Sequence, residues 1–538
     1  MNVVRLLIAI ALCGTILSAC SKSQTAATSG RNPWTQPHVL RLGEPDEPDS
    51  LNPLFANNAA ADLAFGMLYS YLLRYDDEGN YIPDLATEVP SLANGGISKD
   101  NLTVTVHLRK DAKWADGVPL TADDWMFTYH AVFNKNNNTR SQYGWDKIAS
   151  VDEPDKYTIV IHLKEPAVAV LGLMAPGSYP PLPAHLLSKY PNLNKIPFNA
   201  KPLSSGPYVL TAWNHGASLE FAPNPVYFRG QPKLTKILWK EIPDTNTLFT
   251  QLQTHEIDVY SDVSESSIAQ LKNVTGINVS KRLIAYWRRL QFNTNSPLLR
   301  DVRVRLAIAE AVDWPNINDK IYHGYNELAT SDVFPESWAA PTIPRYPYDV
   351  AAAKKLLADA GWAPGPDGIL QKNGTKLHLQ ISTGTNKLEN QQAEVVIQQQ
   401  LKALGMDIEI KNYPVSLLFA QNGPLYTGHY DMEWTVATNG PDPDNSGNWS
   451  SQFIPPKGAN TAWLSDPIVD RTGREASSTF DQAKRKALYQ QEEERIHALV
   501  PAVFFYWENS YLGINTDVKN YKPAAFILDS WNSWEWDI

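Results

Sequence analysis

The chain has 538 residues, a formal net charge of −10 at pH 7 and only two cysteines, Cys13 and Cys20. Acidic residues are spread along the whole chain, which argues against a nucleic-acid partner. The residues after Cys20 can form neither a disulfide nor a thiolate metal site, and the length predicts roughly three domain-sized units. The short enzyme and metal-binding motifs with fixed spacing are missing, so the sequence indicates no catalytic centre, no metal and no cofactor.

The amino terminus has the pattern of a secretory signal peptide over residues 1–19. Arg5 precedes an apolar run from Leu6 to Ala19, which is shorter than the roughly 20 residues that span a bilayer as a helix. The run ends Leu17-Ser18-Ala19-Cys20, which resembles a lipobox. That resemblance implies cleavage before Cys20 and lipidation of its thiol, and two or more acyl chains hold a protein stably to a membrane. An ordinary cleaved signal with an incidental cysteine is the alternative.

Residues 20–37 are expected to form a flexible tether. They are rich in Ser, Thr, Ala, Gly and Gln and contain almost no large apolar side chain. We therefore expect an exported protein, periplasmic or at the cell surface, that is attached to a membrane by its lipid. The sequence leaves open whether that is the inner or the outer membrane.

The segment from Asn101 to Trp125 predicts a strand, a turn and a helix. Its apolar residues alternate over 102–108, as in a strand with one buried face, and Asp116-Gly117 makes a turn. Thr121 is placed to cap a helix, with Asp124 three residues later near the positive helix end.

Four later blocks also have clear local patterns, and the first two lie between residues 205 and 313. Ser205-Gly206-Pro207 and Asn224-Pro225 punctuate loops around short strands. Leu290 to Asn295 precedes a predicted helix over 301–313 with Asp301 as its N-cap and Pro315 as its stop.

Two more helices are predicted in the second half of the chain. Asp349 caps a helix that Gly361 ends, and residues 486–500 form an amphipathic helix that leads into an apolar strand over 502–507. Helices and strands mixed in this way argue for α/β lobes.

These blocks, and above all the order of side chains over residues 101–125, resemble the family 5 extracellular solute-binding proteins. They are the oligopeptide- and dipeptide-binding receptors of bacterial ABC importers, and the resemblance runs from about residue 38 to the carboxyl end. It implies an α/β, two-lobed fold like that of periplasmic binding proteins, with a hinge and an additional domain. By the order of the motifs, lobe I would comprise residues 38–65, 203–292 and 506–538, the additional domain residues 66–202, and lobe II residues 293–505.

The same resemblance implies a receptor that performs no chemistry. It would bind peptides or a related polar solute in a cleft between the lobes, close about the hinge and deliver the solute to an ABC permease complex. We expect it to act as a monomer. The alternatives are the same role for a non-peptide solute, such as an oligosaccharide, or an exported hydrolase or chaperone.

The segment from Tyr430 to Asn445 resembles the family segment that lines the cleft and forms backbone hydrogen bonds to an extended peptide. In the peptide receptors an aspartate shortly before an Asp-Pro step pairs with the ammonium group of the peptide. Here that stretch reads Ala437-Thr438-Asn439-Gly440-Pro441, without the aspartate. Either Asp442 or Asp444 has taken over this role, or the solute has no free ammonium group.

Other candidates lie beside the expected cleft. Arg288 could bind a carboxylate bidentately, and alternation along a strand places Arg288 and Arg289 on opposite faces, so at most one of them points inward. Core placement is the default for most of the 17 tryptophans, whereas for Trp434 and Trp449 a place in the cleft and simple packing are about equally expected. The full set of predicted ligand-binding residues is Leu51, Asn52, Tyr286, Trp287, Arg288, Trp434, Thr438, Asn439, Asp442, Asp444 and Trp449.

Overall fold

The computed structural model describes residues 30–385, 387–526 and 529–538. Its main feature is one mixed sheet that runs through both halves of the molecule. In order across the sheet, its strands are β17 (Asp407–Ile410), β16 (His378–Ser382), β18 (Met432–Thr438), β11 (Ile277–Phe292), β19 (Ala502–Asn515), β10 (Val259–Tyr260), β1 (Val39–Glu44), β9 (Lys236–Glu241), β8 (Ser218–Pro223) and β7 (Tyr208–Asn214), with β12 (Glu327–Leu328) paired to β19.

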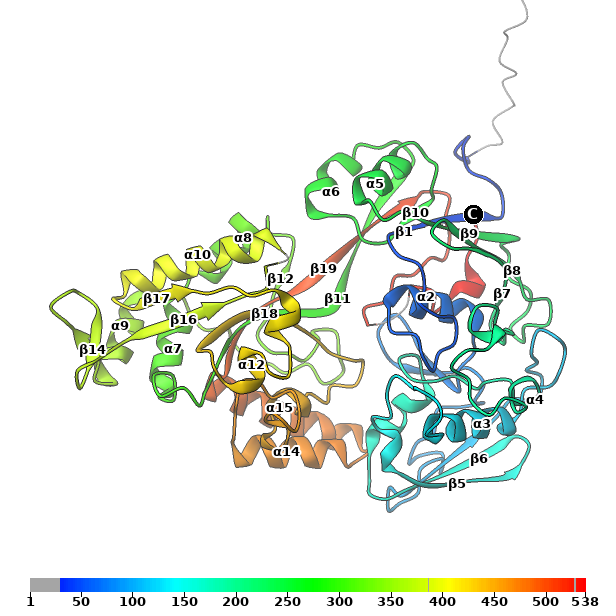
Figure 1. Ribbon diagram of the computed structural model, residues 1–538, viewed down its shortest axis with the longest axis horizontal. Coiled ribbons are helices and arrows are strands. Elements are labelled where there is room, and N and C mark those ends of the chain that lie inside the picture. Colours follow the sequence, from blue (N-terminus) through cyan, green and yellow to red (C-terminus); the bar gives the residue numbers. More distant parts are fainter. Residues whose placement is uncertain (1–29, 386, 527–528) are drawn as a thin grey trace, which may run out of the picture.

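Two long antiparallel strands join the halves. In Figure 1, β11 and β19 run diagonally from the lobe at the right, which carries β1 and β7–β9, to the lobe at the left, which carries β16–β18. We call these the first and the second lobe. The pairing of β11 with β19 is regular from Ile277 to Leu283 and shifts before it resumes at Trp287. This irregular stretch lies between the lobes, where a hinge is expected.

The first lobe shares its core with the segment between α2 and β7. The helices of this lobe are α2 (Ala59–Leu68), α5 (Thr245–Gln253) and α6 (Glu265–Leu271). The connected segment adds β2 (Leu73–Tyr75), β3 (Tyr81–Pro83), β4 (Thr103–His107), α3 (Ala122–Phe133), β5 (Ile148–Asp155), β6 (Thr158–Leu163) and α4 (Ala184–Leu187). One buried cluster contains Leu42 of β1, Trp125 of α3 and Trp239 of β9, so the segment predicted as an additional domain over 66–202 packs continuously on the first lobe.

The second lobe has its own core. This core lies between the helices of the lobe, strands β16 and β18, and the parts of β11 and β19 that belong to the lobe. Phe292, Ile308, Ile381 and Ile397 are members of this buried cluster. The helices are α7 (Val302–Ala311), α8 (Trp314–Ile321), α9 (Val350–Asp359), α10 (Leu388–Ala403), α11 (Val415–Leu418), α12 (Pro424–Thr427), α13 (Ser446–Trp449), α14 (Pro467–Ser477) and α15 (Gln482–Leu499), and a small sheet consists of β13 (Ala363–Pro364), β14 (Leu370–Lys372) and β15 (Thr375–Lys376).

The strand-turn-helix block has the predicted form, and its polar residues serve the fold. Val104 and Val106 of β4 are buried, and Thr121 caps α3. The Asp124 carboxylate accepts hydrogen bonds from the Thr121 N–H at 3.0 Å, the Ala184 N–H at 2.9 Å and the Trp114 indole at 3.2 Å. A buried carboxylate with three donors fixes the start of α3 against its neighbours.

Several predicted boundaries differ from those observed. Helix α7 ends at Ala311, and Pro315 lies in the first turn of α8, because the fixed φ of proline suits a helix start. The strand predicted over 502–507 continues to Asn515, so the boundary proposed between residues 505 and 506 falls inside β19.

The carboxyl-terminal part of the predicted tether, which contains residues 32–35, packs on the first lobe. The Asn32 N–H and the Thr35 hydroxyl donate to Asp517 at 2.7 and 2.6 Å, and the Trp34 ring stacks on His255 with 3.6 Å between centroids. Cys20 and the predicted signal peptide lie outside the described residues. Among the residues that are described, the structure has no helix long and apolar enough to cross a membrane.

Candidate functional site

A cavity of about 540 Å³ lies where β11 and β19 pass between the lobes. Its walls come from both sides: Ser261, Asp262 and the segment 524–526 belong to the first lobe, and Thr383, Lys387 and Trp434 belong to the second. A volume of this size is within the range of roughly 300–1,000 Å³ that encloses small ligands.

Strand β11 contributes a complete face to this cavity. Arg282, Ile284, Tyr286 and Arg288 occur at every second position and all line it. The side chains of a strand alternate between the two faces of the sheet, so Trp287 and Arg289 point the opposite way. Those two are buried, and the Arg289 guanidinium lies over the Trp287 ring at 4.6 Å from its centroid.

Arg288 lies in the wall of the second lobe and is only 3% exposed. Its Nε donates to the Tyr506 hydroxyl at 3.0 Å, and its guanidinium carbon is 5.8 Å from the ring centroids of both Trp434 and Tyr506. Burial by itself lowers the pKa of Arg288, but Tyr506, Tyr322 and Glu508 together outweigh it, so the net shift of its pKa is upward and the guanidinium stays charged.

Trp434 is held rigidly in the same wall. It lies on β18 next to β11, is fully buried against protein atoms, and stacks on Trp314 at 6.0 Å between ring centroids. Its indole donates to the Tyr322 hydroxyl at 3.3 Å. A fixed aromatic wall of this kind presents apolar area at a low cost in conformational entropy.

Charged groups of both signs line the cavity. Asp262 is exposed, whereas Lys387 and Glu508 form an ion pair at 3.9 Å and Arg282 pairs with Asp529. Behind Ser261, the buried Glu44 accepts hydrogen bonds from the Ser261 hydroxyl, and burial raises the pKa of Glu44 to about 7.

The rim of the cavity is apolar on the side of the second lobe. Val415, Leu418 and Phe419, at helix α11 and the residue after it, line the cavity, and Phe419 is 45% exposed. The cavity can therefore accept a solute that carries both charged and apolar groups.

Of the predicted site residues, only Tyr286, Arg288 and Trp434 line the cavity. Leu51 and Asn52 are fully buried: the Leu51 N–H donates to the Asn199 carbonyl at 2.9 Å, and the Asn52 amide donates to the Asn199 side chain at 2.9 Å. Both stabilise the loop that enters α2 and do not face the cavity.

The segment that follows β18 is tied to the second lobe. The Trp287 indole donates to Asn439 at 3.1 Å, and the Asn439 amide donates to the Asp332 carbonyl. Trp449 is fully buried and donates to the Asp332 carboxylate at 2.7 Å. These contacts explain Trp287, Asn439 and Trp449 by packing and hydrogen bonding. For Trp449, packing was the expected alternative to a place in the cleft.

The two aspartates considered as ammonium partners also lie apart from the cavity lining. Asp442 already has a cation, because the Arg485 guanidinium donates to its two oxygens at 2.7 and 2.9 Å. Asp444 accepts from the Ser446 N–H at 3.1 Å in a local turn, and Thr438 is exposed at the end of β18. The acidic groups that do line the cavity are Asp262 and Glu508.

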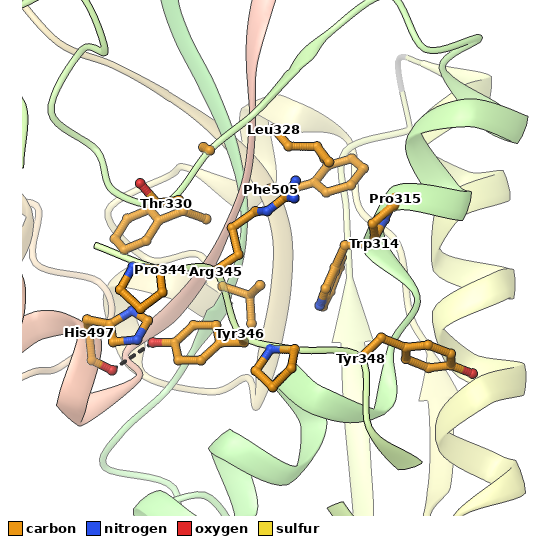
Figure 2. Close-up of a pocket in the computed structure, with 14 residues that line it drawn as sticks. Trp314, Pro315, Leu328, Thr330, Pro344, Arg345, Tyr346, Tyr348, His497 and Phe505 are labelled. Carbon is orange, nitrogen blue, oxygen red and sulfur yellow. Dashed lines mark hydrogen bonds between the residues drawn. The ribbon is translucent and has the colours of Figure 1, made fainter. Parts of the chain in front are cut away.

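A second, smaller cavity of about 350 Å³ lies inside the second lobe (Figure 2). The Tyr346 hydroxyl donates to the His497 carbonyl at 2.7 Å, and the two rings stack at 4.3 Å between centroids. Trp314 and Phe505 line this cavity and contact Trp434, so the same aromatic layer separates it from the cavity between the lobes.

Sequence reasoning missed most of the cavity because its walls come from segments far apart in the chain. Asp262, Lys387, Glu508 and Phe526 lie outside every recognisable motif. One signal was available on β11: once Arg288 is placed inward, the period of two also places Arg282 and Ile284 inward. In the part of the chain that the structure describes, no group of three or more His, Cys, Asp or Glu side chains is arranged to hold a metal ion.

Comparisons with known proteins agree with this architecture. The profile of the bacterial extracellular solute-binding proteins, family 5 Middle, matches residues 80–456. The oligopeptide-binding protein AppA of Bacillus subtilis is 29% identical over 519 residues, which cover 94% of this chain and 93% of AppA.

Two solved structures show the same fold. AppA from Bacillus subtilis in complex with a nonapeptide superposes with a TM-score of 0.72 at 26% identity, covering 93% of this chain and 99% of AppA. NikZ from Campylobacter jejuni in complex with Ni(L-His) superposes with a TM-score of 0.74 at 26% identity, covering 94% of this chain and 100% of NikZ. The chain described here belongs to the bacterial extracellular solute-binding proteins of family 5.

Proposed function

We propose that this solute-binding protein is the extracytoplasmic receptor of an ABC importer and that its solutes are short peptides. The observation that carries the proposal is the cavity between the lobes, which combines opposite charges with an apolar rim. A peptide offers the matching groups, namely charged termini and side chains of mixed polarity. The nonapeptide complex of AppA, a relative of similar length, supports the same class.

The mechanism that fits this geometry is closure about β11 and β19. A solute that contacts both walls stabilises the state in which the lobes are close, because it makes its full set of contacts only there. The closed form would then dock on the permease. The receptor itself would release the solute intact, and incubation with a peptide followed by mass spectrometry would reveal any cleavage.

A non-peptide solute is the second candidate. The structure of NikZ with Ni(L-His) supports it, since the likeness in fold to that protein is as high as to AppA. The stretch Ala437 to Pro441 also lacks the aspartate expected for a peptide ammonium group.

Native mass spectrometry of the protein without residues 1–20, purified from a periplasm, distinguishes the two. A ladder of bound masses that match short peptides is the expected result. A single bound mass that matches no peptide would replace the peptide class by a non-peptide solute. If the protein is purified empty, a thermal-shift screen with defined peptides, oligosaccharides and histidine-metal chelates makes the same distinction.

We further propose that the protein is a lipoprotein attached through Cys20 and acts as a monomer. The lipobox-like residues before Cys20 support the attachment. Replacement Cys20→Ser should move the full-length protein from the membrane fraction to the soluble fraction, while Cys13→Ser should leave it in the membrane fraction. Unchanged fractionation of the Cys20 variant would contradict lipid attachment at this residue.

A further inference from the structure

Four carboxyl groups are buried together inside the second lobe. They come from the segment before Phe334, from β18 and from α15, and none of these residues is more than 1% exposed: Asp332, Glu433, Glu492 and Glu493. A buried carboxylate without a counter-charge costs several kcal/mol. The negative charge of this group, which we call the carboxyl cluster, must therefore be balanced inside the protein.

Arg289 supplies one positive charge to the carboxyl cluster. It points into the second lobe from β11, and the charges of Glu433 and Asp332 both act on it. Because a single guanidinium neutralises one carboxylate of the four, the cluster has more acids than this cation can balance.

The other charged groups near Glu492 do not balance the cluster. Asp444 and Asp470 add negative charge, and the Arg485 guanidinium already donates to both oxygens of Asp442, at 2.7 and 2.9 Å. Among the described residues, neither oxygen of Glu492 has a hydrogen-bond partner. Burial, followed by the neighbouring carboxylates, raises the pKa of Glu492 well above its usual value.

Asp332 and Glu493 form a direct pair in the carboxyl cluster. The Asn445 amide nitrogen donates to both carboxyl groups, at 2.7 Å in each case, and the Trp449 indole donates to Asp332 at 2.7 Å. The carboxyl group of Glu493 also hydrogen-bonds to Asp332. Two carboxylates cannot form such a bond, because neither has a hydrogen to donate. The pair therefore holds a proton, with Glu493 as its donor.

The pair lies next to the surface where the second lobe meets the first. Phe334, two residues after Asp332, packs on Phe526 of the first lobe at 4.6 Å between ring centroids. The segment that supplies the shared amide donor begins near the turn between β2 and β3, where Pro441 is 3.5 Å from a Cβ atom placed at Gly79. Both segments that hold the pair in place thus also contact the first lobe.

Loss of the proton replaces the hydrogen bond of the pair by repulsion between two carboxylates in a medium of low dielectric constant. The repulsion is relieved when water enters or when the segments that carry Asp332 and Glu493 separate. Separation moves Phe334 away from Phe526. Conversely, parting of the lobes uncovers these segments, and water that reaches the pair stabilises its ionised form.

We propose that the Asp332–Glu493 pair is a proton-binding site that couples contact between the lobes, and with it the capture of solute, to pH. The form with the lobes in contact binds the proton more tightly than the form with the lobes apart. The contribution to contact is therefore complete at low pH and is lost as the pH rises through the range in which the contact form releases the proton. The inference rests on the proposed solute-binding function and adds a regulator of the same site.

The first test asks whether Glu493 carries the proton. Infrared spectra near neutral pH are compared for wild type, Glu493→Gln and Glu494→Gln. Gln at position 493 keeps a donor for Asp332, and Glu494 is the exposed neighbour on α15. The absorption of protonated carboxyl groups should lose intensity in Glu493→Gln alone. Equal intensity in wild type and Glu493→Gln would mean that Glu493 is ionised and balanced by a bound cation, which would overturn the proposal.

The second test follows the distance between the lobes without added solute. No cysteine follows Cys20, so the protein without residues 1–20 can carry two dyes on Lys156→Cys, between β5 and β6, and Gln399→Cys of α10, which are both exposed. Energy transfer in wild type should decrease as the pH rises from roughly 5 to 9, and Glu493→Gln should respond less. Glu494→Gln should respond as wild type does. No response in wild type, or an equal response in Glu493→Gln, would overturn the coupling.

The third test separates the coupling from the peptide class. A pool of random tetrapeptides is the probe, and calorimetry in buffers with different heats of ionisation counts the protons taken up on binding. Wild type should take up more protons than Glu493→Gln, and with rising pH it should lose up to about tenfold more affinity per pH unit than that variant.

The comparison with Glu493→Gln is needed because Glu44, whose pKa burial raises to about 7, also lies beside the cavity. Equal proton uptake by wild type and Glu493→Gln would overturn the coupling. If the pool binds to neither protein, the peptide class fails, and the response of the labelled protein to pH decides the proton site by itself.

Discussion

Glu394 of α10 is a fully buried carboxyl group, and within the described residues its side chain accepts one hydrogen bond, from the Asn412 amide at 2.8 Å. Burial raises the pKa of Glu394 from its usual 4.5 to about 7, and the Asn412 hydrogen bond offsets part of the rise. The folded protein therefore keeps this proton at pH values where the unfolded chain has lost it. The contribution of Glu394 to the free energy of unfolding is largest at low pH and falls as the pH rises through this window.

The variant Glu394→Gln should lack this part of the pH dependence. Gln is neutral, has nearly the same shape and can still accept from Asn412. Relative to wild type, the variant should gain up to about 3 kcal/mol in the free energy of unfolding between pH 4.5 and pH 8, since one pKa unit corresponds to 1.36 kcal/mol. Urea titrations at both pH values measure it, with Glu389→Gln, at an exposed position of the same helix, as the control. Parallel pH profiles for wild type and Glu394→Gln would mean that Glu394 ionises normally.

The buried Trp449 provides a residue-level test of packing against ligand contact. Replacement Trp449→Phe removes the donor to the buried Asp332 carboxylate and should lower the free energy of unfolding by about 1–3 kcal/mol. The affinity for solute should stay the same. Trp434→Phe alters the cavity wall and should weaken binding. Thermal unfolding measures the stability and calorimetry measures the affinity for solute. Weaker binding by Trp449→Phe with unchanged stability would mean that Trp449 contacts the solute.

At the scale of elements, the features that could be predicted are those that depend on residues close to one another in the sequence. Thr121 and Asp349 cap α3 and α9 as expected, and alternation separates Arg288 from Arg289. These depend on local backbone geometry, which a few side chains determine. The length of β19 was underestimated because its second half is polar at Glu508, Asn509 and Ser510, and only pairing with β11 keeps it extended.

The cavity depends on long-range packing, which explains why most of its residues could not be predicted. Asp442 looked like a ligand partner in sequence, but Arg485 lies 43 residues further along the chain and reaches it only through the fold of α15. In the same way, nothing near Asp262 or Phe526 in the sequence indicates that they share one cavity with Arg288.

The apolar rim formed by α11 makes an element-scale prediction. Phe419 and Leu417 are similarly exposed, at 45% and 44%, but only Phe419 lines the cavity. Phe419→Ser should weaken solute binding by about tenfold, the effect of roughly 1.5 kcal/mol of lost apolar contact, with little change in melting temperature. Leu417→Ser should leave the affinity unchanged. Equal losses in both variants would mean that the whole exposed face of α11 acts in binding.

At the scale of the molecule, the two lobes meet directly beside the cavity. Phe526 of the carboxyl-terminal segment lines the cavity and packs on Phe334 of the second lobe at 4.6 Å between ring centroids. The turn between β2 and β3 lies against the same place: a Cβ atom at Gly79 would be 2.6 Å from the Phe526 ring and 3.5 Å from Pro441. A larger residue at Gly79 would therefore have to move the Phe526 ring, which packs on the second lobe through Phe334.

The variant Gly79→Ala should therefore act as a wedge between the lobes. Its methyl group displaces Phe526 or holds the lobes apart, and we expect solute affinity to fall about fivefold or more, which is roughly 1 kcal/mol. Because Gly79 has a φ of +83°, alanine also adds backbone strain. Gly216 has a φ of +72° and open space around it, so Gly216→Ala supplies the same strain without the contact. Calorimetry with the bound solute should show weaker binding for Gly79→Ala alone, and small-angle scattering should show a smaller solute-induced compaction for that variant. Equal affinity of the two variants would show that the contact at Gly79 does not contribute to closure, and would leave the paired strands β11 and β19 to govern it.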